Sequence, residues 1–110
     1  MTARPREAPS AFAAHMAAAM DRMMHAMHAS ATGDADRDFL TMMIPRHQGA
    51  IDMAEAVLRY GHDPLVRGLA EEIIASQRIE IASMQARLAV RSGHTHDDEF
   101  PALGGTRGIR

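Results

Sequence analysis

The feature that most constrains the fold is a helical pattern of apolar residues that is interrupted at two places. Between about residues 10 and 92, apolar side chains recur every three or four positions, which is the period of an amphipathic helix. The pattern stops at Gly33 and again at Gly61, after which Asp63-Pro64 supplies a capping residue and a first helical residue. We therefore expect three helices, each beginning at its capping residue, over Ser10–Ala29, Asp36–Tyr60 and Asp63–Ser92.

The length of the chain, 110 residues, is that of a single domain. Because both connections are short, consecutive helices should pack antiparallel. The prediction is an all-α fold, an antiparallel bundle of three long helices over residues 10–92. We expect a flexible arm over residues 1–9 and an irregular tail over residues 93–110.

The composition excludes several classes of protein. The chain has no cysteine, so disulfide scaffolds and thiolate zinc sites are ruled out. A net charge of −2 argues against a nucleic-acid partner, and no apolar run approaches the ~20 residues that span a bilayer. Neither a nucleophile–base pair nor a glycine-rich phosphate motif is present, so we do not expect an enzyme.

Methionine and histidine are unusually frequent, with 10 Met and 7 His. Folding the predicted helices back at Gly33 and Gly61 brings several of these residues to one level of the bundle. That predicted layer consists of Met20, Met23, Met43, His47, Gln77 and Glu80. Thioether and imidazole groups together suit copper, especially Cu(I), and suit magnesium or calcium poorly.

A second cluster of candidate ligands lies on the first helix. Met24 and His28 are four residues apart and His25 and His28 are three apart, so each pair can share a helix face. We expect this cluster to be more exposed than the internal layer and to prefer Cu(II).

Each pattern also has a purely structural explanation. A buried histidine, glutamine and glutamate can satisfy one another by hydrogen bonds, and a stripe of methionines often fills irregular gaps in a core. The histidines of the first helix can simply be solvated.

Two runs of residues resemble a known family. The run from Asp38 to Ala54 contains Met-Met-Ile-Pro-Arg-His-Gln-Gly-Ala-Ile-Asp-Met and looks like the signature of the domain of unknown function 305 (DUF305) family. The run from Leu69 to Met84 is similar to the second half of that family's pattern, and the resemblance covers about half of the chain. It implies a ferritin-like, all-helical fold.

The resemblance also has functional implications. It implies bacterial origin, a periplasmic or secreted location and, for some members, copper binding by Met and His; the sequence as given carries no signal peptide. Met43, His47, Met53 and Met84 match the family's pattern. Where the family usually has a His-His pair, this chain has Arg46 before His47. Since an arginine cation cannot ligate a metal, the resemblance implies a site shifted towards methionine.

We therefore expect a metal-binding protein that buffers, stores or delivers copper in the bacterial cell envelope. The candidate ligands are Met20, Met23, Met24, His25, His28, Met43, His47, Met53 and Met84. The alternative is a structural or partner-binding helical module with a hydrogen-bonded polar layer and no metal. Three helices with this much methionine do not cover their own apolar faces, so we also expect a homodimer.

Overall fold

The computed structural model describes residues 10–28 and 31–93, and this part of the chain consists of three helices and their connections. The helices are α1 (Ala11–Met27), α2 (Ala35–Tyr60) and α3 (Pro64–Gly93). The described residues contain no strand, so the predicted all-α fold is confirmed. The predicted arm over residues 1–9 and all but the first residue of the predicted tail lie outside the described residues.

The helices begin and end close to the predicted positions because the capping side chains act as expected. The Ser10 hydroxyl accepts a hydrogen bond from the backbone N–H of Ala13 at the start of α1. The Asp63 carboxylate accepts from the N–H of Leu65, 2.8 Å away, at the start of α3. The capping residue predicted for α2 was wrong: the helix is capped by Asp34, two residues before the predicted Asp36.

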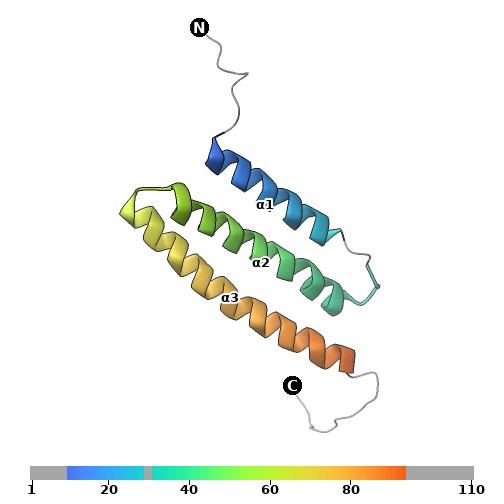
Figure 1. Ribbon diagram of the computed structural model, residues 1–110. Coiled ribbons are helices and arrows are strands. Elements are labelled where there is room, and N and C mark those ends of the chain that lie inside the picture. The colour runs from blue at the N-terminus through green and yellow to red at the C-terminus, as the bar shows by residue number, and fades with distance from the viewer. Residues whose placement is uncertain (1–9, 29–30, 94–110) are drawn as a thin grey trace.

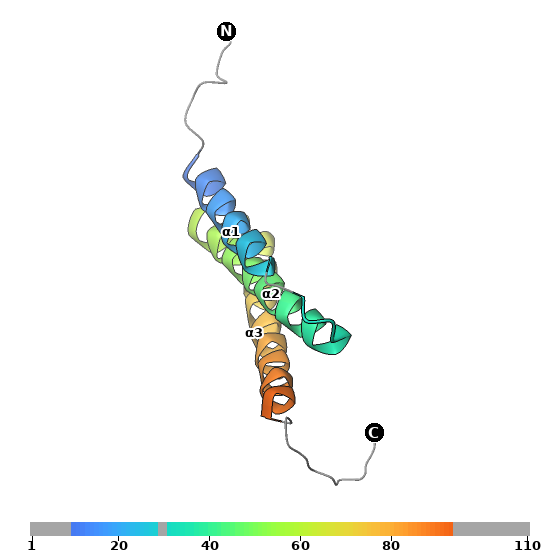
Figure 2. The same cartoon turned by 90° about the vertical axis from the view of Figure 1, so that its right-hand side faces the viewer.

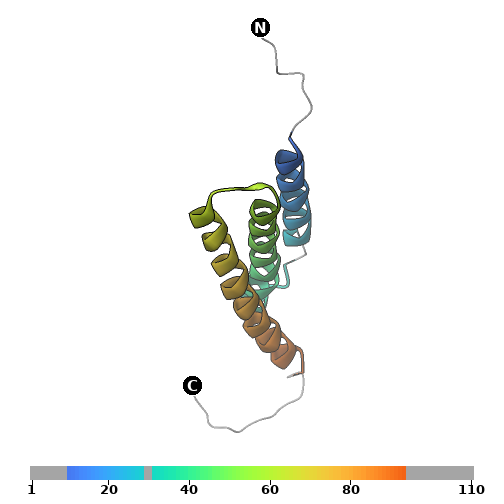
Figure 3. The same cartoon turned by 60° about the vertical axis from the view of Figure 1, so that its left-hand side comes forward.

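The three helices form one layer with α2 in the middle (Figure 1). Both α1 and α3 pack on α2, and within the described residues they do not pack on each other. Figures 2 and 3 show that α3 is inclined to the pair formed by α1 and α2. None of the described helices is long and apolar enough to cross a membrane.

The core is small because a layer of helices encloses little volume. Its main cluster joins α2 to α3 through Ile51, Ala54, Ala70 and Ile74. Among the described residues no polar side chain is buried, so the buried polar layer predicted from the sequence is wrong. The physical reason is the open layer: a polar side chain at the edge of the contact between two helices remains reachable by water.

The connection between α1 and α2 determines how these two helices are aligned. Its described residues, 31–34, lie beside the first turn of α2, and α1 stops short of the start of α2 (Figure 1). The carboxylate of Asp38 accepts hydrogen bonds from the backbone N–H of Thr32 and of Gly33, at 3.0 and 3.1 Å. These hydrogen bonds, those from Thr32 foremost, lower the pKa of Asp38.

Candidate metal centre

The centre of the α2–α3 contact is a hydrogen bond between His47 and Glu80. Nε2 of His47 lies 2.6 Å from Oε1 of Glu80, and the two side chains are 15% and 57% exposed. The sequence placed His47 level with Gln77 and within reach of Gln77 or Glu80. The observed partner is Glu80, so the predicted contact between α2 and α3 is confirmed.

The other nitrogen of His47 fixes the orientation of the ring. Nδ1 lies 2.9 Å from the backbone oxygen of Met43, one turn earlier on α2. A carbonyl oxygen can only accept a hydrogen bond, so Nδ1 carries the proton. Nε2 is therefore the nitrogen that a metal ion could bind, in place of its contact with Glu80. Ligand histidines in metalloproteins commonly have their second nitrogen anchored in this way.

Two methionines lie one helical turn away from the contact between His47 and Glu80, both towards the same end of the layer. Met43 precedes His47 by four residues on α2, and Met84 follows Glu80 by four residues on α3. Because the two helices are antiparallel, both steps lead in the same direction along the layer. Both side chains are half-buried. We call His47, Glu80, Met43 and Met84 the His47 cluster.

The predicted contribution of α1 to this site is wrong. Met23 lies against Gly49 instead of Met43: its sulfur is 2.6 Å from where a Cβ atom of residue 49 would stand. Arg22 bonds Asp52, at 3.4 Å, which fixes the same alignment. Met20 is exposed. The sequence-based alignment assumed a tight turn at Gly33, and the longer connection shifts α1 by about two turns away from Met43.

Met53 is also separate from the His47 cluster. It lines an apolar groove of about 310 Å³ that receives side chains from all three helices, including Met16 of α1 and Leu69 of α3. Its thioether is therefore placed to pack and not to join His47.

The predicted second cluster, at the end of α1, is exposed as expected. Nδ1 of His28 lies 2.7 Å from the backbone oxygen of Met24, which repeats the arrangement of His47 and Met43. His28 thus presents Nε2 to solvent. The structure brings Met24 and His28 together through this backbone contact. The backbone N–H of His28 also donates to the backbone oxygen of His25, 3.2 Å away.

The His47 cluster offers one imidazole, one carboxylate and, one turn away, two thioethers. No group of three His, Cys, Asp or Glu side chains capable of holding a metal occurs in the described parts of the chain. At the His47 cluster one imidazole and one carboxylate are available, so thioethers must supply any further donors. Soft thioether donors favour Cu(I).

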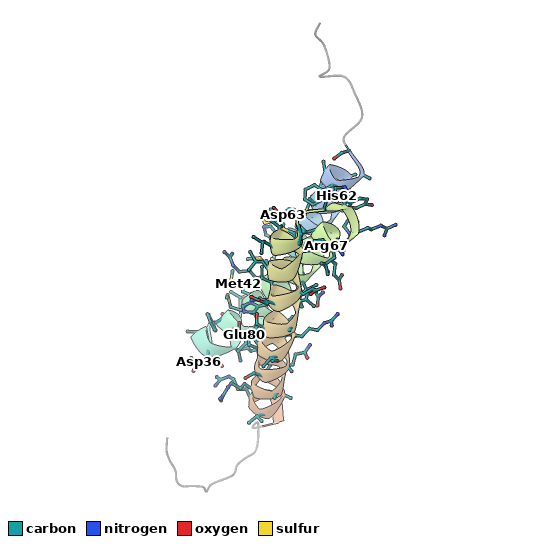
Figure 4. All side chains as sticks on the ribbon, turned by 90° about the vertical axis from the view of Figure 1, so that its left-hand side faces the viewer. Asp36, Met42, His62, Asp63, Arg67 and Glu80 are labelled. Atoms are coloured by element: carbon teal, nitrogen blue, oxygen red, sulfur yellow. The ribbon has the colours of Figure 1, made fainter. Side chains whose placement is uncertain are left out.

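Glu80 belongs to the His47 cluster but is not among the candidate ligands predicted from the sequence. The antiparallel alignment of the predicted helices already placed it in the same layer as His47 and within its reach, so the signal was present in the sequence. Figure 4, viewed from the α3 edge of the layer, shows Glu80 projecting on the same side as Met42 of α2.

Comparisons with known proteins identify a family and one relative. Part of the chain is similar to the uncharacterized protein L153 of Acanthamoeba polyphaga mimivirus, with 39% identity over 56 residues. The match covers 51% of this chain and 37% of that protein, so the chain corresponds to little more than a third of its relative. A family model described as a domain of unknown function (DUF305) matches residues 1–88, and the chain therefore belongs to the DUF305 family.

Proposed function

We propose that the chain binds copper at the His47 cluster and serves to buffer, store or deliver it. The observation that carries the proposal is the hydrogen bond from Nδ1 of His47 to the backbone oxygen of Met43. It holds the ring so that Nε2 lies between α2 and α3, near the level of two methionines. Nothing in this arrangement requires a catalytic step, and we propose binding without catalysis.

Glu80 has a defined part in this proposal. One oxygen of its carboxylate lies 2.6 Å from Nε2 of His47, so copper would have to displace this contact. Because an imidazole binds a metal only through a nitrogen that carries no proton, Cu(I) affinity should fall as the pH is lowered. A site made of thioethers alone would show little such dependence.

The exposed pair of Met24 and His28 is proposed as a second, weaker site that prefers Cu(II). An envelope location rests on the family resemblance alone and is proposed on that basis. We also propose that the chain forms a homodimer, whose interface is considered below.

The test is an anaerobic Cu(I) titration against a competing chelator. His47→Ala and Met84→Leu should each weaken binding at least tenfold, and Met43→Leu should do the same with little loss of stability because leucine has a similar volume. Met42→Leu is the matched control, because this neighbouring methionine is exposed and lies about 100° around the helix from Met43. If His47→Ala binds Cu(I) like the wild type, the site is not at the His47 cluster.

A second candidate function, a partner-binding helical module, is favoured by one observation. Ten large apolar side chains of the described residues are exposed, among them Leu65 and Phe39. A chain that takes up no copper but binds another protein through these side chains would support this alternative.

A further inference from the structure

One face of the helical layer is largely apolar and includes Met16, Met43 and Met53. On α2 this face follows positions that alternate by four and three residues, which places them in one row. The row consists of Phe39, Met43, Arg46, Ala50, Met53 and Val57. We call the side of the layer that carries this row the methionine face.

Both neighbouring helices extend the methionine face. Met16 of α1 and Val66 and Leu69 of α3 line the same apolar groove as Met53. Towards the start of α2, Phe39 lines a second groove with Val90 of α3. Phe39, Leu69 and Val90 are 59%, 55% and 57% exposed, which is far more than apolar side chains of a finished core.

The opposite face of the layer is polar. Asp52 of α2 bonds Arg22 of α1 and also Gln48, at 3.4 and 3.0 Å. Glu55 forms an ion pair with Arg78 of α3, at 3.6 Å. These α2 residues lie on the other side of the helix from the row that contains Met53. This polar face is therefore suited to contact with water. The methionine face is the one that another molecule would have to cover.

We propose that two copies of the chain stack with their methionine faces together. Stable domains bury the apolar side of one layer against a second layer, and a single layer has no such partner. α2 and its two neighbours, spaced about 9 Å apart and about 25–45 Å long, present a face on the order of 900 Å². A standard protein interface buries about 800 Å² on each partner.

Charge on the methionine face favours a second copy as the occupant. Arg46 lies in the centre of the α2 row and makes no ion pair or hydrogen bond with the described residues. Glu80 is half-exposed on the same side of the layer (Figure 4). The groove beside Phe39 adds Asp36, Arg87 and Arg91 to the charges of this face. A face that carries charges of both signs is complementary to a copy of itself when a two-fold axis places opposite charges together.

This inference deepens the proposed function, because Met43 lies in the row that the second copy would cover. The His47 cluster would then be shielded from solvent at the interface, as suits Cu(I). Association itself needs no metal, so it can be measured on chelator-treated protein. A failure of dimer formation is thereby distinguished from a failure of copper binding.

The test is the molar mass of the full, metal-free chain in solution, by light scattering and sedimentation at tens of micromolar. The wild type should have twice the chain mass of 12.0 kDa. Leu69→Glu and Phe39→Glu, at opposite ends of the methionine face, should each produce monomers. Their helix content, followed by circular dichroism, should remain near that of the wild type because both residues are exposed in the single chain.

Ile79→Glu is the matched control. Ile79 is 71% exposed and lines neither of the two grooves. This variant should remain dimeric. A monomeric wild type would overturn the proposal, and would leave a different protein or a lipid as the occupant of this face. Monomers from Ile79→Glu with dimers from Leu69→Glu would also overturn it, because the interface would then be the flank of α3.

Discussion

At the scale of single residues, the same side-chain type has different roles that depend on what it meets. Met23 fills the space above Gly49, where its sulfur stands at 2.6 Å from the position of an absent Cβ. Met43 is instead half-buried one turn before His47, whose ring is anchored by the Met43 backbone oxygen. The sequence analysis treated both methionines as candidate ligands. The glycine at position 49, inside α2, was the sequence feature that could have shown that Met23 packs against a helix instead. Such a glycine often marks a close approach by another element.

Replacing Gly49 by alanine should test that close approach. An alanine inside a helix normally stabilises it by up to about 1 kcal/mol relative to glycine. At position 49 the new methyl group would collide with Met23, and crowding of this kind costs about 1–3 kcal/mol. Gly68→Ala is the control, because nothing lies within 4 Å of the added atom.

Urea unfolding should therefore show Gly68→Ala as more stable than the wild type and Gly49→Ala as less stable than Gly68→Ala by about 1–3 kcal/mol. Adding Met23→Ala should remove the penalty of Gly49→Ala. Equal stability of the two alanine variants would mean that Met23 is not packed on Gly49.

The contact between His47 and Glu80 should contribute little to stability. Glu80 is 57% exposed, and ion pairs at such positions are screened by solvent and contribute about 0–1 kcal/mol. Glu80→Gln should therefore lower the free energy of unfolding by less than about 1 kcal/mol, as measured with urea. A loss several times larger would show that the pair holds α2 to α3, and that its role is structural.

At the scale of elements, connection length decided which parts of the fold could be predicted. The connection between α2 and α3 is short and flanked by Gly61 and Asp63, so the sequence aligned His47 with Glu80 to within one turn. The connection between α1 and α2 is longer and is held along α2 by Asp38. No sequence pattern predicted that contact, so the predicted contact between α1 and Met43 was wrong.

Asp38 should make the protein sensitive to acid. Hydrogen bonds from Thr32 and Gly33 lower its pKa below the ordinary value of 3.8. Between the lowered pKa and 3.8 the unfolded chain binds more protons than the folded one, so stability falls as the pH falls through this range and is fully present above it. Asp38→Asn should lose stability at neutral pH and should lose less on acidification than the wild type.

The measurement is a set of urea unfolding curves from neutral pH down to about pH 3. Asp21→Asn is the control, because the exposed Asp21 makes no hydrogen bond with the described residues. It should follow the wild type at every pH. If Asp38→Asn does so as well, the hydrogen bonds to the connection are not what aligns α1.

At the scale of the whole molecule, the sequence predicted three antiparallel helices but not that they lie in one open layer. Amphipathic periodicity shows that a helix has an apolar side and does not show what will cover that side. A closed bundle and an open layer therefore share one pattern, and only tertiary contacts distinguish them. In the layer α1 and α3 both pack on α2, and four of the seven buried apolar residues are alanines. The single chain thus buries few large side chains.

A chain with so small a core should owe part of its stability to its second copy. Binding that occurs only between folded chains shifts the unfolding equilibrium by mass action, so the thermal midpoint should rise with protein concentration. Scanning calorimetry over a hundredfold range of concentration, with chelator present, should show this rise for the wild type and for Ile79→Glu. Leu69→Glu should have a lower midpoint that does not change with concentration. A midpoint that is constant for the wild type would mean that one layer is stable by itself, and that its methionine face is held open for another purpose.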